Sequence, residues 1–255
     1  MTASTSQIAV VTGANRGLGR ATARALAQRG FAVVLTYRGD AQEAARVVAE
    51  ICAAGGDAIA ARLDLADVAS FADFTVSLRR DIEERWGRSG IDVLVNNAGI
   101  GLFGRLEDAT VDEFDALIGT NVRGTFFLIQ AVVPHIGDGG RIINVSTSLT
   151  RHVSLGTSLY AASKTAVEAI TRSLAVELGP RGIRINSIAP GPTATDFNGG
   201  GMRDDPELRR SLAAHTALGR VGEPDEIADA IAALASDELR WVTAERIEVS
   251  GGSLL

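Results

Sequence analysis

Short runs of apolar residues alternate along the chain with longer segments in which apolar residues recur every three to four positions. The short runs predict β-strands, and the longer amphipathic segments predict helices. The predicted strands cover residues 8–12, 32–36, 58–63, 91–95, 141–145, 184–188 and 246–249. The predicted helices cover residues 18–29, 41–54, 68–86, 206–214 and 224–235, with two further helices beginning near Thr110 and Ser158.

Several helix ends carry their own signals. Thr110 is followed three residues later by Glu113, which is the capping-box pattern of a helix N-terminus. Pro206 and Pro224 each stand near the start of a predicted helix, where proline is readily accommodated. These signals fix the starts of three helices independently of the apolar periodicity.

The predicted strands are nearly continuous runs of Val, Ile and Leu, which is typical of strands covered on both faces. Their alternation with helices predicts an α/β fold: a Rossmann-type, doubly wound parallel sheet of about seven strands with helices on both faces. No linker or low-complexity tract divides residues 1–255, so we expect a single domain, with residues 1–6 as a short disordered lead. Ligands bind such sheets at the carboxyl ends of the strands.

Composition narrows the function classes. The net charge of −6 argues against nucleic acid as a partner. No unbroken apolar run reaches the ~18 residues that span a bilayer, and the N-terminus lacks a secretory pattern. Cys52 is the only cysteine, which excludes an internal disulfide and favours a cytoplasmic location. We expect Cys52 to be a half-buried small hydrophobe.

The polar residues outside the predicted strand ends suggest no other chemistry. Three scattered histidines and one cysteine do not form a metal site. We interpret His135 and His215 as helix-end residues, and His152 as a surface-loop residue, although its loop is one that a substrate could touch. The run 146–148 lacks the Gly-x-Ser-x-Gly elbow, so a serine hydrolase is not supported.

The first predicted strand runs into Thr12-Gly13-Ala14-Asn15-Arg16-Gly17-Leu18-Gly19, and a helix follows. Glycines in this context let the backbone turn tightly and approach a pyrophosphate at the helix N-terminus. The spacing differs from the commoner Gly-x-Gly-x-x-Gly, and no Gly-Lys-Ser/Thr follows, which excludes a phosphate-binding P-loop. A dinucleotide site is the favoured interpretation, and a glycine-rich turn without a ligand is the alternative.

The second predicted strand ends in Tyr37-Arg38, where dinucleotide sites often place a carboxylate for the ribose 2′-hydroxyl. No carboxylate stands there, and Asp40 comes two residues later. Arg38 and Arg16 are suited to pair with a 2′-phosphate instead. We therefore expect NADP(H) as the preferred cofactor. NAD(H) is the alternative if Arg38 is a solvated loop residue or if Asp40 turns back toward the ribose.

Two further strand ends have the composition of a ligand-binding edge. The fourth strand runs into Asn96-Asn97-Ala98-Gly99, where small residues and amides let the backbone lie against a flat ligand. An ordinary turn is the alternative there. The sixth strand runs into Ala189-Pro190-Gly191-Pro192-Thr193-Ala194-Thr195, a rigid turn that presents backbone groups and hydroxyls to a cofactor.

Tyr160 and Lys164 lie one turn apart in a predicted helix and share one of its faces. An ammonium held near a phenol favours the phenolate and lowers the tyrosine pKa from its ordinary value near ~10. A tyrosine tuned in this way donates a proton to a carbonyl oxygen or accepts one from an alcohol. A solvated pair on a helix surface is the alternative.

These motifs together resemble the short-chain dehydrogenase/reductase family, over essentially the whole chain from Thr12 to Gly252. Each motif is weak alone, but their order and spacing are specific. The closest resemblance is to 3-oxoacyl-carrier-protein reductase-like members. The motifs are Thr12-Gly13-x-x-x-Gly17-x-Gly19, Asn96-Asn97-Ala98-Gly99, Asn121, Tyr160-x-x-x-Lys164 and Pro190-Gly191.

The resemblance implies roles for individual residues. Tyr160 would be the general acid/base, and Lys164 would lower its pKa and bond the nicotinamide ribose. Asn121 would hold a water that links Lys164 to solvent, Asp64 would contact the adenine and Thr193 would help hold the carboxamide. The expected cofactor contacts are Gly13, Asn15, Arg16, Gly17, Leu18, Gly19, Tyr37, Arg38, Asp64, Leu65, Asn96, Ala98, Gly99, Tyr160, Lys164, Pro190, Gly191, Thr193 and Thr195.

One position departs from the family pattern. The family places a serine thirteen residues before the tyrosine, where its hydroxyl polarises the substrate carbonyl. Thr147 stands at that position here and keeps the hydroxyl donor. We expect Thr147 to replace the serine, because geometry matters more than which alcohol donates. The alternatives are that Ser148 takes the role or that the active site is impaired.

The resemblance implies an NADP(H)-dependent oxidoreductase that acts on a ketone or secondary alcohol and forms a homotetramer or homodimer. The expected interfaces are the helices near Thr110 and Ser158 and the C-terminal strand. Residues of about 192–216 form the expected substrate-loop region, and the glycines within 197–205 predict a mobile lid. A cofactor-binding regulatory protein with an impaired site is one alternative. An epimerase of the same fold is another, disfavoured by the short chain after Gly191.

Overall fold

The computed structural model describes residues 6–255 and contains a sheet of seven strands, in which each neighbouring pair of strands is parallel. The expected lead lies outside the described residues except for Ser6. The strand order is β3-β2-β1-β4-β5-β6-β7, so the direction of strand addition reverses between β1 and β4. The predicted fold class is confirmed. The strands are β1 (Ile8–Val11), β2 (Ala32–Tyr37), β3 (Asp57–Arg62), β4 (Ile91–Asn96), β5 (Ile136–Val145), β6 (Arg184–Pro190) and β7 (Arg246–Val249).

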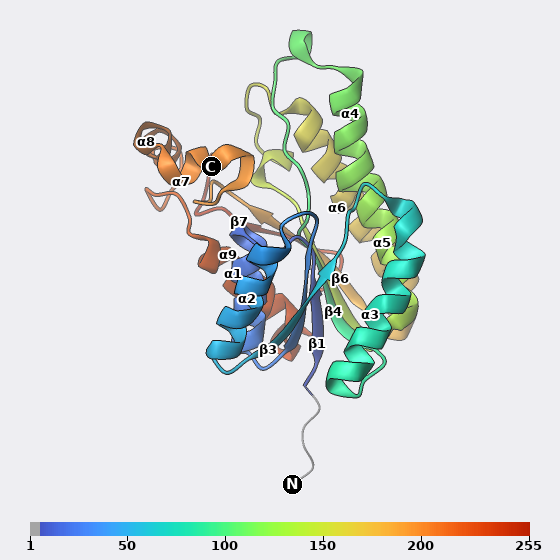
Figure 1. The fold of residues 1–255 in the computed structure, drawn as a ribbon. Coiled ribbons are helices and arrows are strands. Elements are labelled where there is room, and N and C mark those ends of the chain that lie inside the picture. The colour runs from blue at the N-terminus through green and yellow to red at the C-terminus, as the bar shows by residue number, and fades with distance from the viewer. Residues whose placement is uncertain (1–5) are drawn as a thin grey trace.

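Helices cover both faces of the sheet (Figure 1). One face carries α1 (Gly17–Gln28), α2 (Ala41–Ala53) and α9 (Pro224–Ala235). The opposite face carries α3 (Phe71–Trp86), α5 (Thr125–Val132) and α6 (Ser158–Leu178). The remaining helices lie beyond the carboxyl ends of the strands, at the top of Figure 1: α4 (Val111–Leu117), α7 (Gly201–Asp204) and α8 (Pro206–Ala213).

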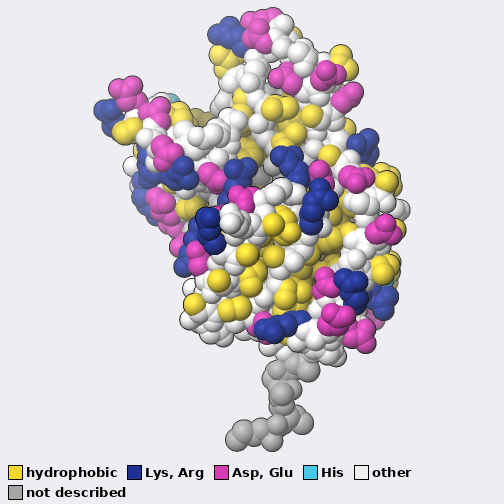
Figure 2. Space-filling view, viewed as in Figure 1, with side chains coloured by type: hydrophobic (Ala, Val, Ile, Leu, Met, Phe, Trp, Pro, Cys, Tyr) yellow, Lys and Arg dark blue, Asp and Glu magenta, His cyan; other side chains and the backbone are white. Residues whose placement is uncertain are grey.

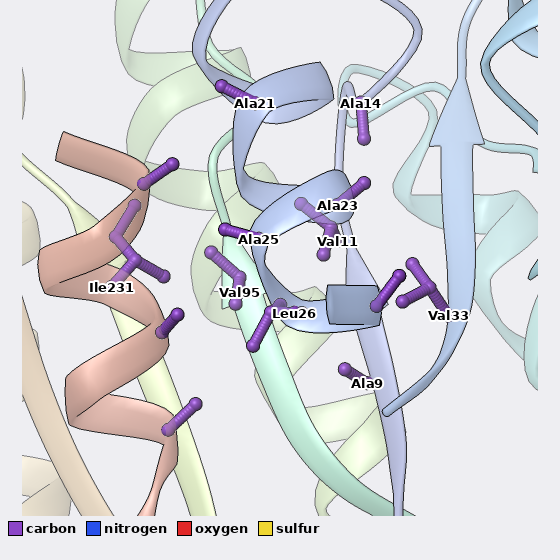
Figure 3. Close-up of a cluster of buried hydrophobic side chains, with 14 of the residues drawn as sticks. Ala9, Val11, Ala14, Ala21, Ala23, Ala25, Leu26, Val33, Val95 and Ile231 are labelled. Atoms are coloured by element: carbon purple, nitrogen blue, oxygen red, sulfur yellow. The ribbon is translucent and has the colours of Figure 1, made fainter. Parts of the chain in front are cut away.

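Helix α1 is held closely against the sheet and against α9 (Figure 3). Most of its buried residues are alanines, and these and Leu26 meet Val11 of β1, Val95 of β4 and Ile231 of α9. Small side chains allow the backbones to approach closely while the interior stays densely packed. The N-terminus of α1 is therefore fixed directly above the end of β1.

The helix predicted near Thr110 begins there with its capping box complete. Thr110 Oγ1 accepts from the Glu113 backbone N–H (3.2 Å), and Glu113 Oε2 accepts from the Thr110 backbone N–H (3.1 Å). The helix continues through a π-helical stretch, Ile118–Gly124, into α5. Such wider turns are rare and concentrate at functional sites. This one turns Asn121 into the interior, where it is 1% exposed.

The helical span Val111–His135 is long and apolar enough, by length and composition alone, to cross a membrane. Its apolar window is 44% buried inside the protein. Its inward residues, among them Leu128, Ile129 and Val132, pack in the core beside α3 and α6. The core helix of a soluble protein has the same composition, so this span is weak support for a membrane segment.

Three local predictions are corrected. The segment 197–205, expected as a mobile loop, forms a short helical turn, Phe197–Gly200, followed by α7. Cys52 is exposed rather than half-buried, because it follows Ile51, which occupies the buried face of α2. His152 is buried rather than on a loop surface, since its ring nitrogen Nε2 lies 3.0 Å from Glu248 Oε1 of β7.

Candidate active site

A cavity of about 630 Å³ opens at the carboxyl ends of the strands, next to the point where the strand order reverses. Figure 2 shows this face hollowed between its two upper lobes, with basic side chains along the edge of the hollow. Lys164 is the only lysine in the chain and is buried, so these basic groups are arginines. Ligands occupy this crevice in doubly wound sheets.

The glycine-rich loop forms one wall of the cavity and lines it with residues 13, 15–19. A Cβ added to Gly19 would stand 2.4 Å from the Gly13 carbonyl oxygen, so only glycine fits there. The Thr12 hydroxyl accepts from the backbone N–H groups of Asn97 (3.0 Å) and Ala98 (2.9 Å). These bonds tie the loop to the end of β4 and leave its backbone facing the cavity.

The end of β2 brings Arg38 to the cavity wall, exposed and facing the open side. Tyr37 does not line the cavity, because its ring packs against the core on the α1 side. Asp40 caps α2 by accepting from the Glu43 backbone N–H (2.9 Å). Its carboxylate is thus engaged away from the cavity. Arg16 lines the cavity but pairs with Asp196 at 3.1 Å.

The ends of β3 and β4 supply the next part of the wall. Asp64 and Leu65 line the cavity, as do Ala98 and Gly99. Asn96 does not, because its side chain points into the sheet and donates to Asn144 Oδ1 of β5 at 2.8 Å. The following residue, Asn97, lines the cavity instead.

Thr147 and Tyr160 meet at the cavity wall, where both are more than nine-tenths buried. Burial raises the pKa of Tyr160 well above its usual range, and a hydrogen bond with the Thr147 side chain offsets part of that rise. The lowering of the Tyr160 pKa by Lys164 stays a prediction. Phe103 and Phe197 flank the phenol, with ring centroids 5.1 Å and 6.0 Å from it.

Lys164 lies one turn further along α6 and also reaches the cavity. Its Nζ donates to the Val145 carbonyl oxygen at 2.9 Å, and burial lowers the pKa of Lys164 to about 8. Asn121 lies behind the cavity wall, where its side chain pairs with both backbone groups of Ile100 at 2.9 Å. A Cβ on Gly99 would lie 3.0 Å from Asn121 Oδ1 and 3.3 Å from Lys164 Nζ. A glycine at position 99 thus lets Asn121 and Lys164 approach each other.

The turn after β6 completes the site and runs beside the glycine-rich loop. Pro190, Gly191, Thr193 and Thr195 all line the cavity. The Thr193 hydroxyl donates to the Gly191 carbonyl oxygen (2.9 Å), and Thr195 Oγ1 accepts from the Phe197 backbone N–H (3.3 Å). The turn is thus internally braced and leads directly into the helical segment above the cavity.

Several cavity residues were not among the predicted contacts. Local sequence gives little signal for most of them, because they come from the loops after β4, β5 and β6 and from the segment of α7 and α8. Phe197 was expected only as part of the lid, although an aromatic residue beside a glycine run was a usable signal. The additional lining residues include Phe103, Ser148, Val153, Asp196, Phe197, Met202, Leu212 and His215.

Fold and site together define an oxidoreductase that acts on C=O or CH–OH groups. The chain matches, over residues 13–253, the family described as enoyl-(acyl carrier protein) reductase. It is 41% identical to an uncharacterized oxidoreductase of Methylorubrum extorquens, over 96% of this chain and 97% of that protein.

Solved structures of similar sequence give the same result as the family match. The promiscuous reductase LugOII, which catalyses keto-reduction at C1 during lugdunomycin biosynthesis, superposes with a TM-score of 0.94 at 39% identity, over 98% of this chain and 99% of that one. The angucycline C-6 ketoreductase LanV with bound NADP gives 0.92 at 40% identity, over 97% and 95%. LanV with NADP and rabelomycin gives 0.89. The chain belongs to the short-chain dehydrogenase/reductase family.

Proposed function

We propose that this protein is an NADP(H)-dependent ketoreductase that transfers a hydride between the nicotinamide and a ketone or secondary alcohol. The observation that carries the proposal is that Thr147, Tyr160 and Lys164 line one cavity together with the glycine-rich loop. A dinucleotide bound along that loop would supply the hydride. The chain's own residues would bind the carbonyl and supply the proton.

Tyr160 is the proton donor in this mechanism. Because burial raises its pKa, the phenol stays protonated near neutral pH, which is the form that ketone reduction requires. Thr147 donates a hydrogen bond to the carbonyl oxygen and stabilises the charge that develops there. Lys164, with its pKa lowered to about 8, remains mainly an ammonium at pH 7 and stabilises the tyrosinate left after transfer. Asn121 acts behind Lys164 by holding the water through which the proton is replaced.

The structure fits a 2′-phosphorylated cofactor at the end of β2. Arg38 is exposed at the cavity edge, and the nearest carboxylate, Asp40, is engaged at the N-terminus of α2. A guanidinium suits bidentate binding of a phosphate. The NADP bound in LanV supports the same choice.

The substrate half of the cavity favours a flat aromatic ketone. Phe103 and Phe197 flank Tyr160, and apolar residues from the following segments extend the surface toward the mouth. Aromatic faces bind planar rings through offset or edge-to-face stacking. Together with the ketones that LugOII and LanV reduce, this supports a polycyclic aromatic ketone of the angucycline type as substrate class. The apolar wall residues are Ile100, Leu149, Val153, Met202, Leu212 and Leu254.

We also infer a single domain, a cytoplasmic location and a homo-oligomer, on the strength of the composition and the family. The regulatory alternative with an impaired site is disfavoured, because Thr147 keeps a hydroxyl that lines the cavity beside Tyr160 and Lys164.

Turnover of polycyclic aromatic ketones with NADPH tests the proposal, and Tyr160→Phe tests its acid. The variant removes only the hydroxyl, so we expect the rate to fall by at least ~10²-fold while NADPH affinity is retained. Tyr37→Phe is the matched control, because it removes the chain's other phenol, which lies off the cavity wall. A Tyr160→Phe enzyme that kept more than about a tenth of the wild-type rate would assign the proton to another residue.

A further inference from the structure

A buried carboxylate lies behind the active-site loop. Glu168, two turns after Tyr160 on α6, is 6% exposed. Its Oε1 is within hydrogen-bond distance of Ser146 Oγ (2.5 Å), Thr150 Oγ1 (2.7 Å) and Arg246 Nε (2.9 Å). A carboxylate that is removed from water requires such donors. Ser146 and Thr150 flank Thr147 in sequence, so Glu168 holds both ends of the short segment that carries it.

The third donor, Arg246, reaches this segment from β7. Its Nη2 donates to the Thr147 carbonyl oxygen at 3.2 Å, and its Nη1 donates to Glu248 Oε2 at 2.9 Å. Glu248 is held in turn by His152 (3.0 Å) and by the Ser250 hydroxyl (2.7 Å). The guanidinium therefore joins Glu168, the Thr147 backbone and Glu248 through one rigid fork.

The contacts leave the Thr147 side chain available to the cavity. Its hydroxyl accepts a long bond, 3.3 Å, from the Leu149 backbone N–H, while its carbonyl is fixed by Arg246 and by the Thr150 hydroxyl (3.0 Å). Glu168 and Arg246 are not among the residues that line the cavity. They touch the Thr147 segment and not the space where substrate and cofactor would bind.

We propose that Arg246, anchored by Glu168, is a positioning residue that sets the direction of the Thr147 hydroxyl by holding the segment 146–150 against α6. The expected effect of Arg246 on ketone reduction rests on the proposed function. The claim that Arg246 holds the segment 146–150 does not. Neither residue belongs to the motifs on which the family resemblance stands. Orienting groups of this kind matter because a displacement of about 1 Å at a reacting group can cost ~10²-fold in rate.

The first test measures hydrogen exchange in the protein alone, without substrate. Arg246→Ala removes all the contacts of the fork, so we expect the amides of 146–152 to exchange at least about tenfold faster, while those of β1 and β2 keep their wild-type rates. Arg246→Lys keeps a charge for Glu168 but lacks the fork. If Arg246→Ala fails to fold, Arg246→Lys should still fold, because the buried carboxylate of Glu168 keeps a charged partner. Its amides in 146–152 should still exchange faster than in the wild-type protein.

Arg151→Ala is the matched control. Arg151 is also an arginine near Glu248, at 3.5 Å, but it is largely exposed and has no contact with the Thr147 carbonyl in the structure's described residues. Wild-type exchange is expected in that variant. Unchanged exchange of 146–152 in both Arg246 variants would overturn the inference.

The second test is a double-mutant cycle on ketone reduction. If Arg246 acts through Thr147, Arg246→Lys should lower kcat about tenfold with little change in the KM for NADPH, and should have almost no further effect in a Thr147→Ala background. If the effects of Arg246→Lys and Thr147→Ala on kcat multiplied, Arg246 would act independently of Thr147, and the inference would be contradicted. If the wild-type enzyme reduces no ketone, the proposed function fails, and the exchange experiment still decides whether Arg246 holds the segment.

Discussion

Two hydroxyl residues, Thr147 and Ser148, stand side by side where a carbonyl-polarising donor is needed. Both are buried and both line the cavity. Of the two, it is the Thr147 side chain that partly offsets the rise in the pKa of Tyr160 caused by burial. This favours Thr147 as the donor, so the replacement of the family's serine is conservative in chemistry as well as in position.

The Thr147 substitutions separate these two residues. Thr147→Ala should lower kcat by about 10²-fold, because one preformed donor to the developing oxyanion is worth about that much. Thr147→Ser should retain or improve the wild-type rate, since it keeps the donor and removes only a methyl group. Steady-state kinetics with a reducible ketone provide the measurement. A neutral Thr147→Ala together with a severely impaired Ser148→Ala would assign the role to Ser148.

Arg38 decides cofactor preference in the proposed site. Arg38→Ala should reduce kcat/KM for NADPH by about tenfold or more, because a charge-assisted bond to the phosphate is worth about 1.5–3 kcal/mol. The values for NADH should stay nearly unchanged, since NADH has no phosphate for Arg38 to bind. Equal efficiency of the two cofactors in the wild-type enzyme, or a preference for NADH, would contradict the assignment.

At the scale of elements, the apolar pattern predicted the sheet and most helix ends, because a strand buried on both faces and a capped helix each leave a local signature. Helix α9 begins and ends where the pattern placed it, and the capping box at Thr110 is present. The π-helical stretch around Asn121 left no such signature. Nor did the helical turn at Phe197–Gly200, in which Gly199 and Gly200 adopt φ of +80°, a conformation that glycine takes readily.

The ion pair between Arg16 and Asp196 connects the glycine-rich loop with the segment that leads into α7. In the proposed site, Asp196 would compete with the cofactor phosphate for the Arg16 guanidinium. Asp196→Asn should therefore tighten NADP⁺ binding by up to about fivefold, the equivalent of an exposed ion pair of up to about 1 kcal/mol. Fluorescence titration at low salt measures the affinity for NADP⁺.

Asp204→Asn is the control for this experiment, because Asp204 pairs with Arg203 on the outer surface of α7. It should leave NADP⁺ binding unchanged. Weaker binding in Asp196→Asn would show that the pair stabilises the arrangement that binds NADP⁺, and would reverse the sign of the prediction.

At the scale of the molecule, the contacts that the sequence did not predict join residues that are far apart in the chain. Arg246 and the Thr147 carbonyl are 99 residues apart in the chain. His152 is buried because Glu248 comes to it from β7, and neither local sequence predicts the other. The sequence correctly predicted strand ends at the motifs that contain Asn96 and Tyr37. The direction of each side chain there depends on packing against β5 and α1, which no local pattern reports.

Exposed apolar residues include two groups that lie on surfaces expected to form interfaces. One lies on the helical span Val111–His135 and on α6, and it includes Phe114, Phe126, Phe127 and Val176. The other lies beside the edge strand β7, where Trp241 is 98% exposed. Apolar surface and an open sheet edge are both unfavourable in contact with water. They fit the two interfaces that a tetramer of this family would use.

We therefore predict a homotetramer or homodimer in solution, and sedimentation at micromolar concentration tests it. Phe127→Glu should shift the distribution toward smaller species, because the substitution would bury an unpaired carboxylate in the helical interface. Val76→Glu is the control. It puts the same charge on an exposed apolar position of α3, outside the expected interfaces, and should leave the mass unchanged. A 26.6 kDa species alone in the wild-type protein would exclude both assemblies.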